Sequence, residues 1–402
     1  VQHHAALAAT LCDAPVNVTL TREESIRVHP KRHAMSVRMD VGCDSEGNLT
    51  FCAAVVTGDT GAYASLGAEV VARATVPAPG PYRFGALRLE GRTVYTNNPP
   101  AGAMRGFGVP QVAFAVEALV DRLADAAGID RLEFRAQNGL RSGWPFSTGQ
   151  TMEPDVRFVE TLDAVRAAYD EARTAGKAVG IASAIKNVGI GVGVPDVGRV
   201  RLDVAAGRVA VHSGAACMGQ GIEQVLRNVV CGTLELPPDS VDVFLGDTAT
   251  TPESGVTTAS RQTYLTGGAC LIASRALAET LERAGSLEAL EGRSFPAEFG
   301  PLTHSVHSDE VNPRTHVAFG CASQGVILGE GGEIERIVTG VDAGQVVNPL
   351  GVLGQVEGGT VMGLGYALSE SLGLRDGVPG HTNMAKLGLP RATDVPAMVV
   401  HL

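Results

Sequence analysis

Three glycine-rich loops hold the residue types best suited to chemistry. They are the arginine loop GAMRGFGVPQ (102–111), the glutamine loop GAACMGQGIEQ (214–224) and the threonine loop SGVTTASRQTYLTGGA (254–269). Glycine beside a helix start lets backbone N–H groups approach an anion, which is an ordinary way to hold a phosphorylated cofactor. Taken alone, each loop is better explained by helix capping and tight turns. The occurrence of three in one chain favours a cofactor site.

Two side chains in these loops are harder to explain as turn formers. Arg105 presents a permanent cation beside Phe107, just before a helical segment. Gln220 lies between Gly219 and Gly221, where its carboxamide can both donate to and accept from an inorganic oxo or hydroxo ligand. A structural hydrogen bond is the alternative explanation for each. The two residue types together are consistent with a site for an anionic or metal-containing group.

The loops are expected to lie between the strands and helices of a mixed α/β chain. The first part predicts a helix over 2–12, strands within 15–21, 33–43, 48–63 and 92–98, and a helical stretch over 109–138 interrupted by the turn AAGID. After a connector at 141–150, helices are expected at 156–176, 222–236, 267–285 and 349–370, and strands at 199–214, 239–247 and 333–344. A polar stretch from Ser286 to His316 has poor periodicity and predicts a surface excursion or a place where residues are missing.

Composition and charge narrow the class of protein. At 402 residues the chain is too long for one ordinary core and predicts two or more units. Hydrophobic residues make up 45% and charged residues 19%, which argues against disorder. The net charge of −11 and the lack of a Lys/Arg-rich block argue against nucleic acid or an anionic membrane surface as partner.

The cysteine pattern indicates neither a disulfide framework nor a metal cluster. The seven cysteines are scattered and contain no C-x-x-C pair, so they are interpreted as buried thiols of a reducing compartment. Neither an iron–sulfur ligand set nor a G-x-G-x-x-G after a strand is present. Because the sequence also has no long apolar run and no signal-peptide pattern at its start, we expect a cytoplasmic location.

The order and spacing of the glycine-rich segments are more informative than any one of the segments. The segment PAGAMRGFGVPQ (100–111), the segment MGQG (218–221) and the run NPLGVLGQVEGGTVMGLGYALSE (348–370) resemble, in order and spacing, the molybdopterin-binding part of the xanthine dehydrogenase and aldehyde oxidase family of molybdenum hydroxylases. The segments TREESIRVHPKRH (21–33) and RTVYTNNPPAG (92–102) belong to the same pattern. The resemblance covers almost the whole chain and is closest to members that hydroxylate purines or nicotinate.

The resemblance implies an α+β or mixed α/β fold of two elongated molybdopterin-binding domains. Residues 1–145 would form the first domain portion, with a substrate-side loop, and residues 146–402 the second. Molybdenum would be held by the pterin dithiolene without direct side-chain ligation. The implied reaction hydroxylates an electron-poor C–H carbon of an N-heterocycle or aldehyde with oxygen from water. The resemblance leaves open whether the remaining ligand on molybdenum is oxo, sulfido or selenido.

The resemblance implies a role for several individual residues. Gln220 matches the family glutamine that hydrogen-bonds the oxo group on molybdenum, and Arg105 matches the loop beside the metal. Arg73 occupies the place of a substrate-facing arginine, with a surface salt bridge as the alternative. Phe107 is expected to pack on a planar substrate ring, with core packing as the alternative. The residues expected to contact the cofactor are Ala103, Met104, Gly106, Gly219, Gly221, Thr257, Thr258, Ser260, Arg261, Gln262, Gln355, Gly358 and Gly359.

Several departures from the family pattern affect the expected activity. The sequence lacks the family's upstream Gly-Gly-Phe-Gly-Gly-Lys loop and its downstream Gly-Glu-Pro glutamate, which deprotonates the metal-bound hydroxide. The nearest lookalike, around Glu330, predicts a turn. We therefore expect a subunit or fragment of an active complex, and the alternative is a non-catalytic pterin-binding or scaffold chain. A copper–molybdenum site is disfavoured because Met104–Phe107 replaces the cysteine loop of carbon monoxide dehydrogenases.

The resemblance also implies partners. Iron–sulfur clusters and FAD are expected on other chains, as an iron–sulfur subunit and an FAD subunit, together with another molybdopterin subunit. The expected assembly is a hetero-oligomer, with further dimerisation left open. Whether the pterin carries a cytosine nucleotide is open in the same way.

Overall fold

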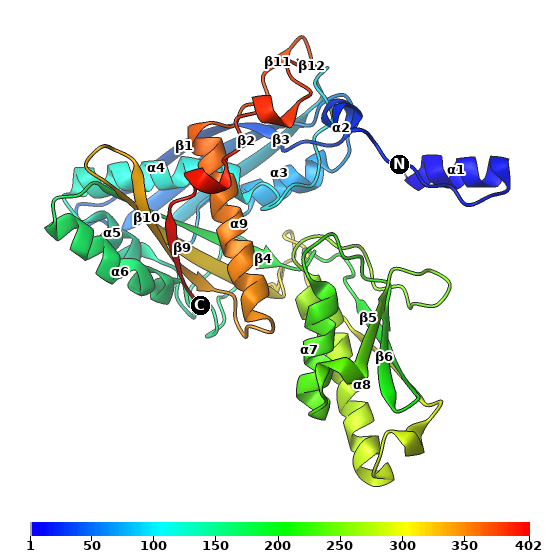
Figure 1. The fold of residues 1–402 in the computed structure, drawn as a ribbon. Helices are drawn as coiled ribbons and strands as arrows, with labels where there is room; N and C mark the ends of the chain where they lie inside the picture. Colours follow the sequence, from blue (N-terminus) through cyan, green and yellow to red (C-terminus); the bar gives the residue numbers. More distant parts are fainter. Residues whose placement is uncertain (1) are drawn as a thin grey trace.

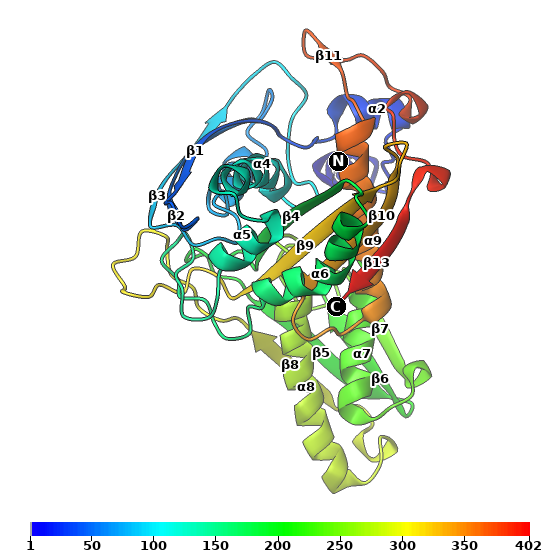
Figure 2. The same ribbon diagram turned by 90° about the vertical axis from the view of Figure 1, so that its left-hand side faces the viewer.

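The first part of the chain forms a three-stranded sheet with helices packed on it (Figure 1). The computed structural model describes residues 2–402. The elements of this part are α2 (Arg22–Val28), β1 (Ala34–Cys43), β2 (Leu49–Asp59), α3 (Gly67–Thr75), β3 (Ala86–Val94), α4 (Val109–Ala127) and α5 (Arg131–Asn138). Strands β1 and β2 pair antiparallel, and β3 joins β2 in parallel after α3 crosses over. Figure 2 shows the sheet curving around α4, which contacts β1.

A second sheet combines strands from distant parts of the sequence. Its strands, in the order β13-β10-β9-β4, are β13 (Ala397–His401), β10 (Ile334–Asp342), β9 (Ala318–Leu328) and β4 (Val179–Val188), and its helices are α6 (Phe158–Thr174) and α9 (Pro349–Leu368). Ser323 bonds to Thr161 of α6, and the next residue, Gln324, donates to Thr360 of α9. Because successive strand residues point to opposite faces, α6 and α9 cover opposite sides of this sheet.

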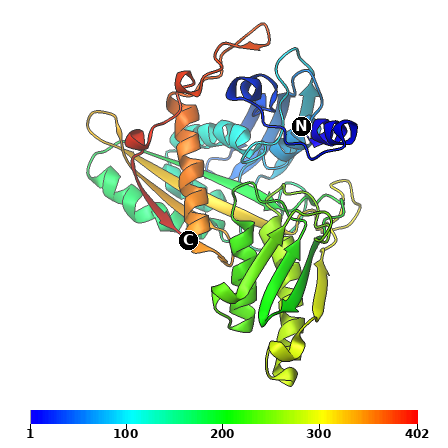
Figure 3. The same ribbon diagram turned by 45° about the vertical axis from the view of Figure 1, so that its right-hand side comes forward.

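The lower lobe, residues 198–299, extends away from these sheets (Figure 3). Its strands, in the order β7-β6-β5-β8, are β7 (Val241–Leu245), β6 (Arg208–Ser213), β5 (Gly198–Ala205) and β8 (Ser294–Phe299). The helices α7 (Ile222–Leu234) and α8 (Gln262–Ala284) pack together, and short 3-10 turns occur at η1 (Pro238–Ser240) and η2 (Glu288–Leu290). The β5–β6 hairpin turns at Ala206 and Gly207, which both have a positive φ angle.

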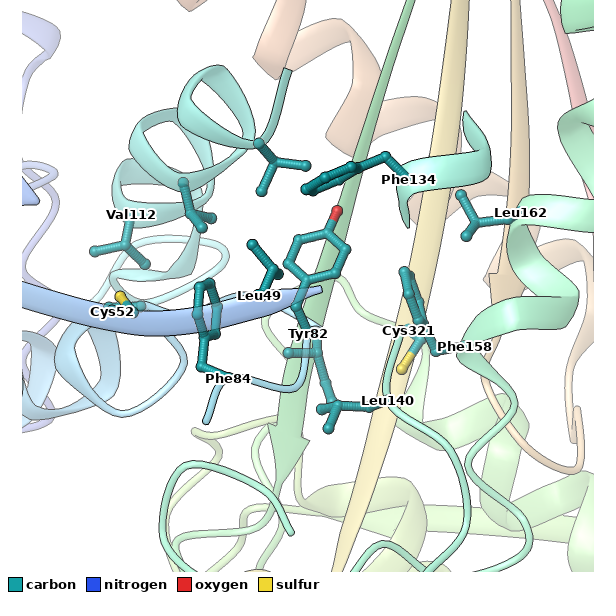
Figure 4. Close-up of a cluster of buried hydrophobic side chains, with 14 of the residues drawn as sticks. Leu49, Cys52, Tyr82, Phe84, Val112, Phe134, Leu140, Phe158, Leu162 and Cys321 are labelled. Atoms are coloured by element: carbon teal, nitrogen blue, oxygen red, sulfur yellow. The ribbon is translucent and has the colours of Figure 1, made fainter. Parts of the chain in front are cut away.

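Two hydrophobic cores form among residues 2–402. The first joins the two sheets and takes Leu49, Phe84 and Phe134 together with Phe158 and Cys321 (Figure 4). This core contains residues from both sides of the domain boundary that the sequence predicts after residue 145. The two predicted domain portions, 1–145 and 146–402, therefore share one hydrophobic core. The second core lies within the lower lobe, between its sheet and the helices α7 and α8.

The remaining elements lie at the periphery. They are α1 (Gln2–Cys12), the hairpin β11 (Leu374–Arg375) and β12 (Val378–Pro379), η3 (Met384–Lys386) and η4 (Ala392–Asp394). Helix α1 has no buried residue and projects away from the molecule (Figure 1). Over residues 2–402, no helix has the length and apolarity needed to cross a membrane.

The structure matches the predicted mixture of helices and strands but corrects several elements. No strand forms at 15–21. The unpredicted helix α2 begins directly after this segment, where Thr21 and Glu24 form a capping box. Helix α3 and the strands β4 and β9 were not predicted, and β8 lies inside the supposed surface excursion. Strand β3 ends at Val94 rather than covering 92–98. The break at AAGID is confirmed, because Gly128 ends α4 in the left-handed conformation.

Candidate functional site

The arginine loop is bound to helix α9 through Arg105. Nη2 of Arg105 donates to the backbone oxygen of Gln355 over 2.7 Å and also to its side-chain oxygen. A Cβ atom at position 358 would lie 3.0 Å from Nη1 of Arg105, so Gly358 leaves the space that the guanidinium needs. Three residues that the sequence predicts for one site are thus brought together from positions about 250 residues apart.

The arginine loop holds an unusual backbone conformation. Gly106, Phe107 and Gly108 have φ angles of 91°, 50° and 99°, and Phe107 occupies the left-handed region without being glycine. A Cβ atom on Gly108 would lie 2.6 Å from the backbone oxygen of Val70 and 3.0 Å from Cβ of Ala74, so this loop packs closely on α3. Non-glycine residues in this conformation are concentrated at functional sites, where surrounding contacts maintain the strain.

The glutamine and threonine loops meet at one carbonyl group. The backbone oxygen of Ala216 accepts hydrogen bonds from Nε2 of Gln220 at 3.1 Å and from Oγ1 of Thr257 at 2.8 Å. Oε1 of Gln220 accepts from the N–H of Met218 at 2.6 Å, and Nε2 of Gln262 donates to Thr257 at 2.9 Å. Both groups of the Gln220 carboxamide are therefore bonded within its own loop, and the residue as a whole is half-buried.

Arg261 holds the threonine loop in place from inside the protein. Its guanidinium, 1% exposed, binds the carboxylate of Asp196 and donates to the backbone oxygens of Ser254 and Val197, both at 2.7 Å. Ser260, next to it, has a φ angle of 52°. The sequence predicts Arg261 as a cofactor contact, but its side chain is bonded entirely within the protein.

The glutamine loop presents backbone N–H groups at the start of α7. The φ angles of Gly219 and Gly221 are 100° and 81°, and, apart from the glycine and its chain neighbours, no atom of residues 2–402 lies within 4 Å of where a Cβ would stand on either residue. The N–H groups of Gly219 and then Gly221 lower the pKa of the Cys217 thiol. Several donors therefore point toward one place where negative charge is stabilised.

Arg73 lies near the end of α3 and is half-buried rather than placed in a surface salt bridge. Its Nη1 donates to Nε2 of His316 over 2.7 Å, and its pKa is lowered to about 10 by burial, with Asp196 opposing the shift. Sequence interpretation missed His316 and the neighbouring Lys186. A lysine within the otherwise largely apolar strand segment IASAIKNV was the signal that could have identified Lys186.

The Gly329–Gly332 segment forms the turn between β9 and β10, as predicted. The N–H of Gly332 donates to the oxygen of Gly329 over 3.0 Å, and Glu330 is exposed. Between residues 2 and 402, the structure contains no group of three or more His, Cys, Asp or Glu side chains that could hold a metal ion. Any metal at the three loops would thus depend on a cofactor rather than on such a cluster.

Known proteins match the chain over most of its length. Two family models described as molybdopterin cofactor-binding domain match residues 1–139 and, in two overlapping parts, 158–312 and 301–396. A probable xanthine dehydrogenase subunit of Bacillus subtilis is 32% identical over 440 aligned residues, covering 99% of this chain and 59% of that protein. The nicotinate dehydrogenase large molybdopterin subunit of Eubacterium barkeri is 42% identical over 166 residues, covering 41% of this chain and 39% of the subunit.

Solved structures show the same fold. The aldehyde oxidoreductase from Desulfovibrio desulfuricans superposes with a TM-score of 0.87 at 24% identity, covering 98% of this chain and 46% of that protein. The predicted fold class is thereby confirmed. The chain spans between about half and three-fifths of the length of the relatives that it matches throughout. These matches establish that the chain belongs to the molybdopterin cofactor-binding domain family.

Proposed function

We propose that the chain is the molybdenum-binding part of a hydroxylase that oxidises an electron-poor C–H carbon of an N-heterocycle or an aldehyde, with water as the oxygen source. The observation that carries this proposal is the contact between Arg105 and Gln355, because it joins the arginine loop to the helix of the third family motif. The relatives named for xanthine and for nicotinate support a heterocycle of the purine or nicotinate type.

The residues present fit a molybdenum–molybdopterin group. The N–H groups of Gly219 and Gly221, which lower the pKa of the Cys217 thiol, stabilise negative charge at the glutamine loop, and the phosphate of the pterin is assigned to the threonine-loop segment 257–263. Thr258 is half-buried and Ser260 is exposed, and their hydroxyl groups are assigned as further donors. Gly359 on α9 stands beside open space, where a planar group can approach the helix backbone. When bound, the cofactor supplies oxygen insertion from water and accepts the electrons of the substrate.

The side chains keep the roles inferred from the sequence. Arg105, fixed by α9, lines the metal side of the site, and Arg73 faces the substrate. Phe107 packs on the substrate ring. To hydrogen-bond the metal site, Gln220 gives up the two hydrogen bonds that it makes to Met218 and Ala216 within its own loop.

We also propose that the chain works as part of an assembly. The relatives in B. subtilis and E. barkeri are named as subunits, which supports a subunit role for this chain. We assign the iron–sulfur clusters and FAD to partner subunits of a hetero-oligomer that includes another molybdopterin subunit, and we assign a cytosine dinucleotide form to the pterin. The free state of all seven cysteines supports the proposed cytoplasmic location.

The purified complex provides the test. Metal analysis should find stoichiometric molybdenum, acid hydrolysis should release cytidine monophosphate, and xanthine or nicotinate should drive reduction of an artificial dye. A fully assembled complex without molybdenum would refute the hydroxylase and favour the non-catalytic pterin-binding or scaffold chain.

A further inference from the structure

A group of basic side chains from three separate elements gathers beside the candidate site. Arg73 comes from α3, Lys186 from the end of β4, and His316 from the segment just before β9. His316 is fully buried, and Arg73 and Lys186 are half-buried. We call these three residues the basic cluster.

His316 acts as a neutral acceptor within the basic cluster. Burial, with the charges of Arg73 and Lys186, lowers its pKa to about 3. Since arginine can only donate, Nε2 of His316 accepts the 2.7 Å bond from Arg73, and Nδ1–H donates to Oγ1 of Thr315 over 3.0 Å. Thr315 in turn donates to Oε1 of Gln150 over 3.0 Å. This chain of bonds fixes the orientation of the Arg73 guanidinium.

The two cations of the basic cluster lack a carboxylate partner. Within residues 2–402, neither Arg73 nor Lys186 forms a salt bridge, and Nζ of Lys186 donates to the backbone oxygen of its neighbour Asn187 over 2.9 Å. The nearby carboxylate of Asp196 already binds Arg261 and accepts from the N–H of Ile190 at 2.7 Å. Burial, and secondarily Arg73, lowers the pKa of Lys186 to about 7. Desolvated cations without counter-charge favour the binding of an anion.

The basic cluster is in contact with the loops that surround the candidate cofactor. Helix α3, which carries Arg73, packs against Gly108 of the arginine loop. A Cβ atom on Gly191 would lie 3.1 Å from the ring of His316. In the same segment after β4, the N–H of Gly189 donates to the oxygen of Ala259 in the threonine loop over 3.0 Å. The cluster thus lies between the arginine and threonine loops.

We infer that Arg73 and Lys186 bind the carboxylate of an anionic substrate, and that His316 is a positioning residue for Arg73. The arginine offers a planar fork for two carboxylate oxygens, and the lysine adds a point charge. This inference rests on the proposed function and narrows its substrate class to planar heteroaromatic carboxylates, in preference to neutral purines and aldehydes.

The test compares two ligands of equal shape and different charge. Calorimetric titration of the assembled complex, without oxygen or an electron acceptor, measures the binding of nicotinate and of the neutral nicotinamide. We expect the wild type to prefer nicotinate by at least roughly tenfold. Lys186→Met should remove most of this preference while leaving nicotinamide binding unchanged. The exposed Lys386→Met serves as the matched control and should bind both ligands as the wild type does.

Stability separates ligand binding from a structural role. Removing a half-buried cation that has no counter-charge should leave the melting temperature of the ligand-free Lys186→Met complex unchanged or raise it. Lys186→Arg keeps the charge and should retain the preference for nicotinate. Equal affinity of the wild type for both ligands, or absence of nicotinate binding, overturns the inference.

The positioning role of His316 has its own pair of variants. His316→Gln can still offer an oxygen acceptor to Arg73, whereas His316→Phe keeps only the aromatic packing against Phe146 and Phe319. The nicotinate-to-nicotinamide preference should survive in the Gln variant and fall in the Phe variant. Equal preferences in both variants would remove His316 from this role.

Failure of the inference can be told apart from failure of the proposed function. Dye reduction by neutral heterocycles without selective nicotinate binding would keep the hydroxylase and reject the carboxylate site. Selective nicotinate binding that depends on Lys186, in a complex without substrate-dependent dye reduction, would keep the anion site and reject the hydroxylase.

Discussion

Two arginines in the upper part of the molecule have opposite electrostatic surroundings. Arg135 is 0% exposed and binds the carboxylates of Glu117 at 2.9 Å and Asp121 at 2.8 Å. Glu117 also accepts from the Tyr82 hydroxyl at 2.6 Å, so the charges and donors of this group are matched inside the fold. Arg73 instead contacts a neutral imidazole and lies near Lys186. An arginine whose charge is balanced by carboxylates of the protein, such as Arg135, has a structural role. An arginine without a carboxylate partner, such as Arg73, can bind an anionic ligand.

The largest expected effect concerns the matched arginine. Arg135→Met leaves the buried Glu117 carboxylate without its cation, so the free energy of unfolding should fall by about 3–5 kcal/mol. Chemical denaturation of the complex, followed by circular dichroism, measures this loss. Arg122→Met on the same helix as Glu117, at an exposed position, is the control. If Arg135→Met lowered the free energy of unfolding no more than Arg122→Met does, Arg135 would not have the structural role that distinguishes it from Arg73.

The unmatched arginine should respond in the opposite way. Arg73→Met should change the free energy of unfolding little, yet weaken substrate binding by about 2–5 kcal/mol, because a bound carboxylate would lose its bidentate partner. The Michaelis constant and the titrated affinity for nicotinate report the second quantity. Unchanged kinetics would exclude Arg73 from the site.

A smaller effect is expected from pH. Lys186, with a pKa of about 7, is protonated in both free and bound states below that value, so nicotinate affinity should be constant there. Above pH 7 a proton must be taken up on binding, and affinity should fall by up to roughly tenfold for each pH unit. The surrounding groups Arg73 and His316, with pKa values of about 10 and about 3, keep their charge states across most of this range. Nicotinate titrations between about pH 6 and 9 should show this fall in affinity for the wild type and no such fall for Lys186→Met.

The smallest effect on stability is expected at Gln220. Its two hydrogen bonds lie in an exposed loop, so Gln220→Ala should cost no more than about 1 kcal/mol in unfolding free energy. Turnover should decline far more if the carboxamide faces the metal site. Parallel losses of stability and turnover would assign Gln220 a purely structural role.

The sequence predicted the loops of the site better than their surroundings. Arg105 and Gln355 were assigned to one site from their motifs, and the structure joins them. Helix α3 was missed because its apolar period covers only nine residues, between Gly67 and the segment before Pro77. A short helix gives too few turns for a clear periodic pattern.

The basic cluster could not have been predicted from local patterns. Lys186 and His316 are separated by the entire lower lobe, and they approach only because β4 pairs with β9. His316 lies at the end of a polar stretch whose composition indicates a surface position, yet it is buried beneath Phe146 and Phe319. Burial of this kind arises from strand pairing over a long sequence separation, which single-sequence periodicity does not contain.

The pairing of β4 with β9 also dictates an order of events during synthesis on the ribosome. The residues of the lower lobe are consecutive in the chain, and all the fully buried residues of their core are present once Phe299 has emerged. The first core must wait for Cys321 and Val338, although more than half of its residues are translated before the lower lobe begins. The nascent upper part therefore carries exposed apolar surface for the time needed to translate about a hundred further residues, a period in which chaperones would be expected to bind it.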